Sequence, residues 1–275
     1  MPISLHAGRI PVYSQALGVS EDQFEALARW IAEIAAPTDA LLEIGAGDGD
    51  DKYFGLVRPL VERIVGVDPD PHSSRHAGLD EWHRTTVEEF SRRLPATTAG
   101  PDQPNLVPGS TAAGPLQSPA AHGSPLYDLA LAVYVVEHVA KPVGFFQAAR
   151  ACLRPGGSLF VVTPNLWHYF GVLAKAATAL GIEERLLDAL RAERPEHHGV
   201  AHFSVAYRAN SVSALRRIGQ EAGYSALEIR HLDNPAVFEA YFPGWSVAFP
   251  RWYSAMVHRI GRTELFGTLI CRFVN

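Results

Sequence analysis

The chain has 275 residues and a net charge of −5, with 47% hydrophobic and 19% charged residues, a composition typical of a globular protein. The acidic balance disfavours a nucleic-acid partner. The first twenty residues lack the pattern of a secretory signal, and no apolar run is long enough to span a bilayer. The two cysteines have no metal-binding spacing, and we expect packed thiols, no metal and a cytoplasmic location.

The first ninety residues predict one amphipathic helix followed by alternating strands and helices. The helix is expected over Ser20–Ala36, with Ser20 and Gln23 as a capping box. The elements expected after it are strands at Ala40–Ile44 and Arg63–Val67, a weaker strand at Trp82–Thr86 and a short helix through Phe90.

Residues 95–125 differ from the rest of the chain in composition. They hold seven prolines and four glycines, with almost no large apolar side chains. Such a segment cannot bury enough surface to offset its ordering entropy, so we expect a surface insertion. A lid over the substrate is the alternative.

Strands and helices alternate again after the insertion. We expect a strand at Leu129–Val136, a helix at Val143–Leu153, a turn at Arg154–Gly157 and a strand at Ser158–Val162. A helical stretch at Leu166–Ala192, broken near Gly181, follows. The last expected elements are a helix from the cap Asn210 to Ala222 and strands at Leu227–His231 and Leu265–Phe273. The alternation predicts an α/β domain over residues 1–275, with a mainly parallel sheet and helices on both faces.

A glycine-rich turn follows the strand expected at 40–44. Gly45 and Gly47 allow a tight turn and a close approach of the backbone to a ligand. A dinucleotide-binding loop would need a third glycine at position 50, where Asp50 stands. The same stretch carries four carboxylates: Glu43, Asp48, Asp50 and Asp51. With no basic residue before Lys52, this loop disfavours a pyrophosphate and suits a cationic ligand.

Five segments together point to one family. They are Leu41–Gly49, Ile64–Pro69, Tyr127–Ala130, Val136–Val139 and Leu153–Gly157. In order and spacing they resemble the motifs of class I S-adenosylmethionine-dependent methyltransferases. The likeness covers about Leu41 to Asn165, interrupted by the insertion. It implies a Rossmann-like sheet that is mostly parallel with an antiparallel last strand.

The resemblance also implies a cofactor, S-adenosylmethionine, and the residues that hold it. These are Glu43, Gly45, Ala46, Gly47, Asp68, Pro69, Thr86, Val87, Ala132 and Tyr134. Glu43 would lie near the ammonium group, and Asp68 would accept hydrogen bonds from the ribose hydroxyls. Pro69, Thr86 and Val87 would border the adenine, and residues 132–134 would lie beside the reactive methyl group.

Histidines are the candidates for a catalytic base, because imidazole titrates near neutrality. His138 follows the strand at 129–136 and is the first choice; His168, after the strand at 158–162, is the second. A packed or helix-starting histidine is the alternative for each.

Residues of about 165–260 exceed what closing the sheet requires, and we interpret them as an acceptor-binding elaboration. The candidate acceptor-binding residues are Trp167, Tyr169, His198, His202 and Tyr207. Aromatic faces beside histidines suit a sugar or a ring-shaped acceptor. A hydrophobic core with a subunit interface, as in a homodimer, is the alternative.

Four functions follow from these observations. The first is an O-methyltransferase that acts on a small molecule, most simply a sugar or oligosaccharide of bacterial polysaccharide biosynthesis. The second is a methyltransferase that tailors a secondary metabolite or quinone. A non-catalytic cofactor-binding protein is the third, and an NAD-dependent oxidoreductase, disfavoured by Asp50, is the fourth.

Overall fold

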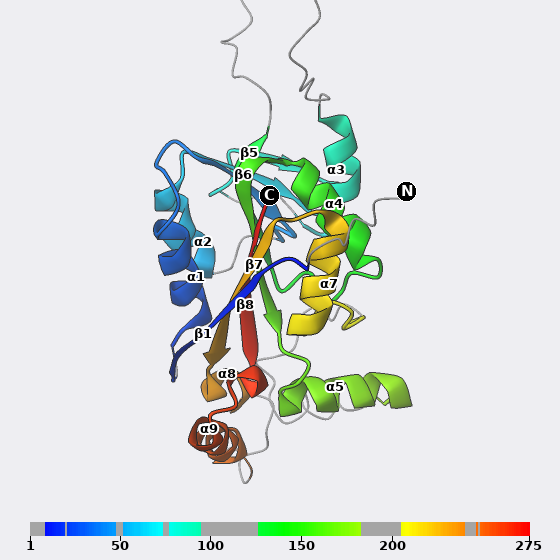
Figure 1. Ribbon diagram of the computed structural model, residues 1–275. Coiled ribbons are helices and arrows are strands. Elements are labelled where there is room, and N and C mark those ends of the chain that lie inside the picture. The colour runs from blue at the N-terminus through cyan, green and yellow to red at the C-terminus, as the bar shows by residue number, and fades with distance from the viewer. Residues whose placement is uncertain are drawn as a thin grey trace, which may run out of the picture.

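A computed structural model describes residues 9–19, 21–47, 52–73, 77–94, 126–182, 205–239, 246 and 248–275 (Figure 1). The predicted insertion at 95–125 lies outside these residues. So do Ser20, His198 and His202. Within the described residues, no helix is both long and apolar enough to cross a membrane.

One eight-stranded sheet carries the fold. Its strands, in spatial order, are β1 (Val12–Val19), β7 (Ala226–Asp233), β8 (Thr268–Val274), β6 (Leu153–Pro164), β5 (Tyr127–Val133), β2 (Ala40–Ile44), β3 (Arg63–Val67) and β4 (Glu81–His83). Only β8 runs antiparallel to its neighbours β6 and β7 in these pairings, and every other pair is parallel. The predicted fold class is therefore confirmed.

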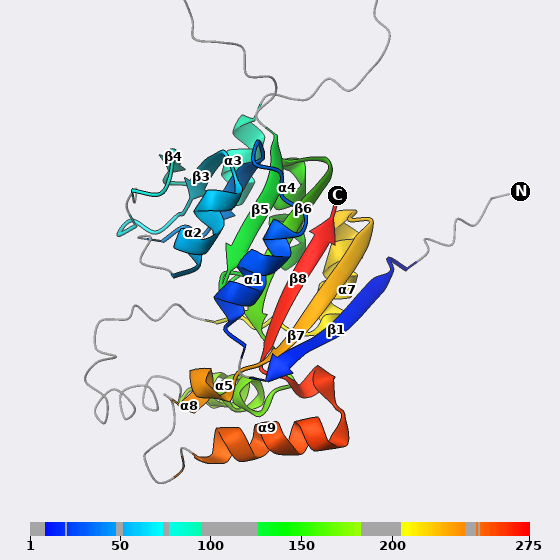
Figure 2. The same ribbon diagram turned by 90° about the vertical axis from the view of Figure 1, so that its left-hand side faces the viewer.

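Helices cover both faces of the sheet (Figure 2). One face carries α1 (Gln23–Ala32) and α2 (Lys52–Val57), and the other carries α3 (Val87–Arg93), α4 (Pro142–Ala151) and α7 (Val212–Ala222). Because helices exclude water from both sides, β2, β3 and β5 are nearly continuous apolar runs, as buried parallel strands are. Cys152 and Cys271 are buried in the core, as expected of packed thiols.

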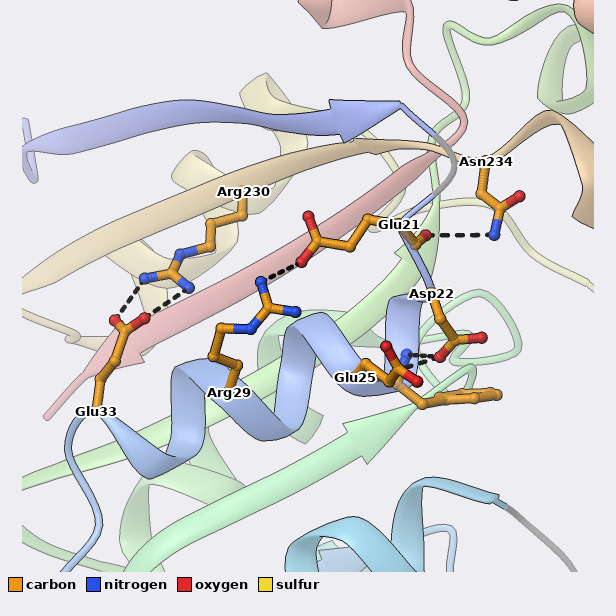
Figure 3. A network of polar contacts seen from close by, with 8 residues as sticks. Glu21, Asp22, Glu25, Arg29, Glu33, Arg230 and Asn234 are labelled. Atoms are coloured by element: carbon orange, nitrogen blue, oxygen red, sulfur yellow. Dashed lines mark hydrogen bonds and ion pairs between the residues drawn. The ribbon is translucent and has the colours of Figure 1, made fainter.

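Helix α1 begins later than predicted, because a different residue caps it. The Asp22 side chain accepts hydrogen bonds from the backbone N–H groups of Phe24 and Glu25, at 2.9 and 3.1 Å. These bonds satisfy donors that the first helical turn leaves open. Figure 3 shows how the helix is then tied to β7: the guanidinium of Arg230 binds both oxygens of the Glu33 carboxylate.

Several other predicted boundaries also shift. The turn predicted at Arg154–Gly157 lies within β6, because Leu153 already pairs with β5 and the N–H of Gly156 donates to the carbonyl of Asn275. Ser211, not Asn210, caps α7, because its hydroxyl accepts the N–H of Ala214. Thr86, predicted as the end of a strand, instead caps α3, and its hydroxyl accepts the N–H of Glu89. The helix predicted from Leu166 starts at Tyr169 and forms α5 (Tyr169–Leu180), which ends at a left-handed Gly181 with φ 65°.

Three helices lie beyond the end of the sheet at which the parallel strands finish (Figure 2). They are α5, α8 (Pro235–Glu239) and α9 (Ala248–Ile260), and a 3-10 turn, η3 (Thr263–Leu265), connects α9 to β8. Another 3-10 turn, η1 (Arg58–Leu60), joins α2 to β3. Strand β1 was not predicted. It adds to the edge of the sheet by pairing with β7.

Candidate functional site

The glycine turn lies at the carboxyl ends of β2, β3 and β5, which are neighbours in the sheet. Gly45 has φ 76°, and its N–H donates to the carbonyl of Val67 at 2.8 Å. A Cβ at this position would lie 2.4 Å from Cγ2 of Val135, so both the dihedral angle and the space require glycine. Gly47 has φ 56°, and no atom of the residues that the structure describes lies within 4 Å of an added Cβ. The turn therefore packs against the loop after β5 on one side and leaves room on the other.

The carboxylate of Asp68 joins this turn to the end of β3. One oxygen accepts the N–H of Gly47 at 2.8 Å, and the other accepts the N–H of Asp70 at 2.7 Å. The residue is 7% exposed. A carboxylate has about four acceptor positions, so each oxygen keeps one for a ligand. Asp68 thus fixes the turn and can still accept hydroxyl donors such as those of a ribose.

A second buried carboxylate and three aromatic rings complete this edge. Glu43, 2% exposed at the end of β2, accepts a hydrogen bond from the Tyr53 hydroxyl. The Tyr53 ring centroid lies 5.6 Å from that of Phe24, and Tyr134 meets Phe24 edge-on at 6.4 Å. Tyr134 follows β5 in the left-handed region, with φ 55°. The edge therefore combines two carboxylates with an aromatic wall.

These features fit the implied cofactor. Its ammonium and sulfonium charges suit an edge that presents Glu43 and Asp68, and its ribose suits the acceptor positions of Asp68. Among the described residues, nothing fills the space beside Gly47, which suits a close approach of a ligand to the turn. The remaining acidic residues predicted in this loop, Asp48, Asp50 and Asp51, lie outside the described residues.

The other predicted cofactor residues surround this edge to different degrees. Ala46 is 1% exposed and its N–H donates to Val67 at 3.3 Å. Pro69 is exposed beside Asp68, whereas Thr86 is half-buried as the cap of α3. Val87 and Ala132 are buried in the hydrophobic core, so their side chains contribute to packing.

Glu137 and His138 follow β5 at the same edge. The Glu137 side chain accepts a hydrogen bond from Thr163 at 3.3 Å, and Thr163 in turn accepts one from Asn210 at 2.6 Å. Burial raises the pKa of the Glu137 carboxyl to about 7. His138 is half-buried. A partly accessible imidazole therefore lies next in the chain to a buried carboxyl group that titrates near neutrality.

His168 occupies a different environment. It is 2% exposed, and its ring lies 4.1 Å from Tyr169, 4.4 Å from Phe238 and 5.0 Å from Tyr253, between ring centroids. Its Nδ1 accepts the N–H of Phe170 at 3.4 Å, so it caps α5. Burial lowers the pKa of this imidazole to about 3. A group with this pKa is a weak base at neutral pH.

The predicted acceptor-binding residues do not form one cluster. Tyr169 packs in the aromatic group around His168. Tyr207, with φ 47°, lies instead beside the end of β5, where its N–H donates to the carbonyl of Glu137 at 3.1 Å. Trp167 is 59% exposed and lines a groove along α7. His198 and His202 are outside the described residues.

The sequence prediction missed two parts of this edge. Neither Phe24, within the predicted first helix, nor Tyr53 was among the predicted site residues. Their contact depends on α1 and α2 lying side by side at the end of β2, an arrangement that no local pattern reports. The sequence signal that could have indicated them is their position: Phe24 follows the helix cap Asp22, and Tyr53 comes shortly after the glycine turn.

Known proteins are similar to this chain at two levels. The family described as "Methyltransferase domain" matches residues 19–229. A curated protein, the ubiquinone biosynthesis O-methyltransferase of Methylobacterium sp. (strain 4-46), is 33% identical over 128 residues. That match covers 46% of this chain and 41% of the relative, so the chain spans less than half of the relative's length in this match.

Two solved structures align with nearly the whole chain at low identity. A SAM-dependent methyltransferase from Archaeoglobus fulgidus has a TM-score of 0.49 and 14% identity, covering 92% of each chain. The YcgJ protein from Bacillus subtilis has a TM-score of 0.47 and 12% identity, covering 91% of this chain and 98% of its own.

Proposed function

The chain belongs to the methyltransferase domain family, and we propose that it methylates a hydroxyl group of a small molecule. It is an S-adenosylmethionine-dependent methyltransferase. The cofactor supplies a methyl group on a sulfonium, a leaving group that is already activated. The chain's own task is therefore to align the acceptor, exclude water and remove a proton.

The cofactor-binding residues we propose are those of the glycine-turn edge. Gly45, Ala46 and Gly47 would hold the methionine portion, with the Glu43 carboxylate near the ammonium group. Asp68 would hold the ribose through the acceptor positions that its bonds to Gly47 and Asp70 leave. Pro69, Thr86 and Val87 would border the adenine, and Ala132 and Tyr134 the methyl group.

We assign the catalytic base to His138. Its imidazole is half-buried after β5, the strand whose end lies beside the glycine turn. A base must lose and gain its proton near the working pH, and the lowered pKa of His168 opposes that role. We assign His168 to holding the start of α5 instead, in keeping with its bond to the N–H of Phe170.

The observation that carries the acceptor proposal is the aromatic wall at the cofactor edge, where the rings of Phe24 and Tyr134 are partly exposed and the ring of Tyr53 is buried. Stacked or edge-on rings favour a flat, aromatic acceptor such as a phenol or quinol. The similarity to an O-methyltransferase of ubiquinone biosynthesis supports the same acceptor class.

A sugar hydroxyl is the second candidate. The observation that favours it is Tyr207, half-buried beside the end of β5, because aromatic faces pack on the C–H surfaces of sugars. This candidate corresponds to a role in bacterial polysaccharide biosynthesis.

A labelled-methyl transfer experiment separates the two acceptors. The protein is supplied with S-adenosylmethionine carrying a labelled methyl group and with two panels, one of catechols and hydroquinones and one of sugars and oligosaccharides. We expect label on oxygen in the first panel. Transfer only to the sugars would replace the phenolic acceptor with the second candidate, and transfer only to nitrogen would overturn O-methylation.

A further inference from the structure

A groove of about 810 Å³ runs along α7, away from the glycine-turn edge. None of its residues comes from β2, β3 or β5, the strands that carry that edge. Helix α7 forms one wall, and the segment that leads into β1, the turn η3 and Trp167 form the rest. Figure 2 shows α7 on the side of the sheet where β1 and β7 lie.

The groove is cationic although the protein as a whole is acidic. It is lined by four arginines, Arg9, Arg216, Arg217 and Arg262, and by one carboxylate, Glu264. The whole chain has a net charge of −5. A concentration of positive charge in one concave surface of an acidic protein attracts anions locally.

The existing partners of these arginines leave most of this charge available. Arg217 pairs with Glu221 at 3.0 Å, and Arg262 pairs with Glu264 at 3.1 Å. Both side chains of each pair are about half exposed or more. Exposed pairs of this kind contribute little free energy and are easily exchanged. Arg9 and Arg216 have no carboxylate partner among the described residues.

Arg216 is held in place rather than neutralised. Its Nη2 donates to the backbone carbonyl of Ile10 at 3.1 Å, and its buried Nε has no hydrogen-bond partner in the part of the chain that the structure describes. Arg217 follows it on the same helix, and Ser213, one turn earlier, lines the groove near the positive end of the α7 dipole. One fixed guanidinium group beside more exposed ones in the same groove suits an anion with several oxygens.

We propose that this groove binds a small phosphate-bearing ligand, with phosphate oxygens on the arginines and a ring of the ligand against Trp167. The planar fork of arginine matches phosphate oxygens in two-point hydrogen bonds, which favours phosphate over a single carboxylate. Trp167, which lines the groove and is 59% exposed, offers a flat face to a nucleobase. The proposal does not depend on the acceptor that the enzyme methylates.

Calorimetry on the full chain tests the proposal. The protein is first saturated with S-adenosylhomocysteine, so that a nucleotide cannot enter the cofactor edge, and is then titrated at low salt with inorganic pyrophosphate, UDP or citrate. The groove variant is Arg217→Ala with Arg262→Ala, whose side chains are 59% and 64% exposed. The matched control is Arg29→Ala with Arg93→Ala, at 59% and 66%, which removes the same charge elsewhere.

We expect pyrophosphate and UDP to bind, and the groove variant to weaken both by at least about tenfold, as loss of charged hydrogen bonds does. The control should stay within about twofold, a change that long-range charge alone explains. UDP should bind more tightly than pyrophosphate, and Trp167→Leu should remove that advantage. No binding of either phosphate at millimolar concentration, equal weakening in both double variants, or citrate binding as tight as pyrophosphate would overturn the proposal.

Discussion

The glycine-turn edge and the groove along α7 hold charge in opposite ways. At the edge, Glu43 and Asp68 are carboxylates 2% and 7% exposed, each fixed by hydrogen bonds. In the groove, Arg217 and Arg262 are guanidinium groups more than half exposed. A charge interaction strengthens as water is excluded from it. Single changes at the edge should therefore have larger effects than single changes in the groove.

The two regions also differ in how the chain assembles them. Gly45, Gly47 and Asp68 lie in the turns that directly follow two consecutive strands, β2 and β3. The groove brings Arg9 and Arg262, near opposite ends of the chain, to the same helix. A sequence motif can report the first arrangement, whereas only tertiary structure reports the second.

The largest effect should come from the proposed base at the edge. We expect His138→Ala to lower kcat on the order of 10²- to 10⁴-fold, because a hydroxyl acceptor would lose its proton acceptor. Affinity for S-adenosylhomocysteine should stay near that of the parent. Steady-state kinetics and calorimetry measure the two quantities, with His72→Ala, an exposed histidine, as the control. Near-parental turnover and an unchanged acid-side pH profile in His138→Ala would rule out this assignment.

The buried carboxyl group of Glu137 should make the stability of the protein depend on pH. Its pKa is raised from 4.5 to about 7, so from about pH 4.5 to 7 the folded protein keeps a proton that the unfolded chain loses. Its contribution to stability is therefore present below pH 4.5 and is lost as the pH rises to 7. His168, with its pKa lowered from 6.5 to about 3, acts in the opposite direction between those values.

Glu137→Gln removes only the first of these contributions. Relative to the parent, its free energy of unfolding should rise by about 3 kcal/mol between pH 4.5 and 7, because one pKa unit corresponds to about 1.4 kcal/mol. Urea unfolding at several pH values measures the difference. Glu264→Gln, at a half-exposed position in the groove, is the control variant. A pH-independent difference for Glu137→Gln would mean that the carboxyl group is already ionised in the folded protein.

The sequence predicts the edge better than the rest of the fold, for physical reasons. The bounds of β2 and β3 are confirmed at both ends, because a strand buried on both faces reads as an apolar run between turns. Strand β1 is mostly exposed at the edge of the sheet, so its side chains show no clear alternation of apolar and polar residues. Backbone pairing with β7 holds it in the sheet. Burial of Glu137 depends on Thr163 and on the loop at 205–207, and local sequence does not report either contact.

Asp68→Ala should have an effect of intermediate size. We expect affinity for S-adenosylhomocysteine to fall by about 1–3 kcal/mol, through loss of charged hydrogen bonds to the ribose and of the bond that fixes Gly47. Asp39→Ala is the matched control, because this carboxylate also accepts a backbone N–H, that of Ala36, but lies before β2. Calorimetry reports the affinities. Equal affinity in Asp68→Ala and the parent would refute the placement of the ribose.

The smallest effect tests how the aromatic wall is held at the edge. Phe24 lies in the first turn of α1, and the Asp22 side chain accepts its N–H. Asp22→Ala should lower the free energy of unfolding by about 1 kcal/mol, as loss of a helix cap does. Ser20→Ala, which alters the residue that the sequence pattern favoured as the cap, should change it by less than about 0.5 kcal/mol. Urea unfolding compares the two variants. If Ser20→Ala were the more destabilising, the cap would be Ser20, and Phe24 would lie one turn inside the helix and not at its entrance.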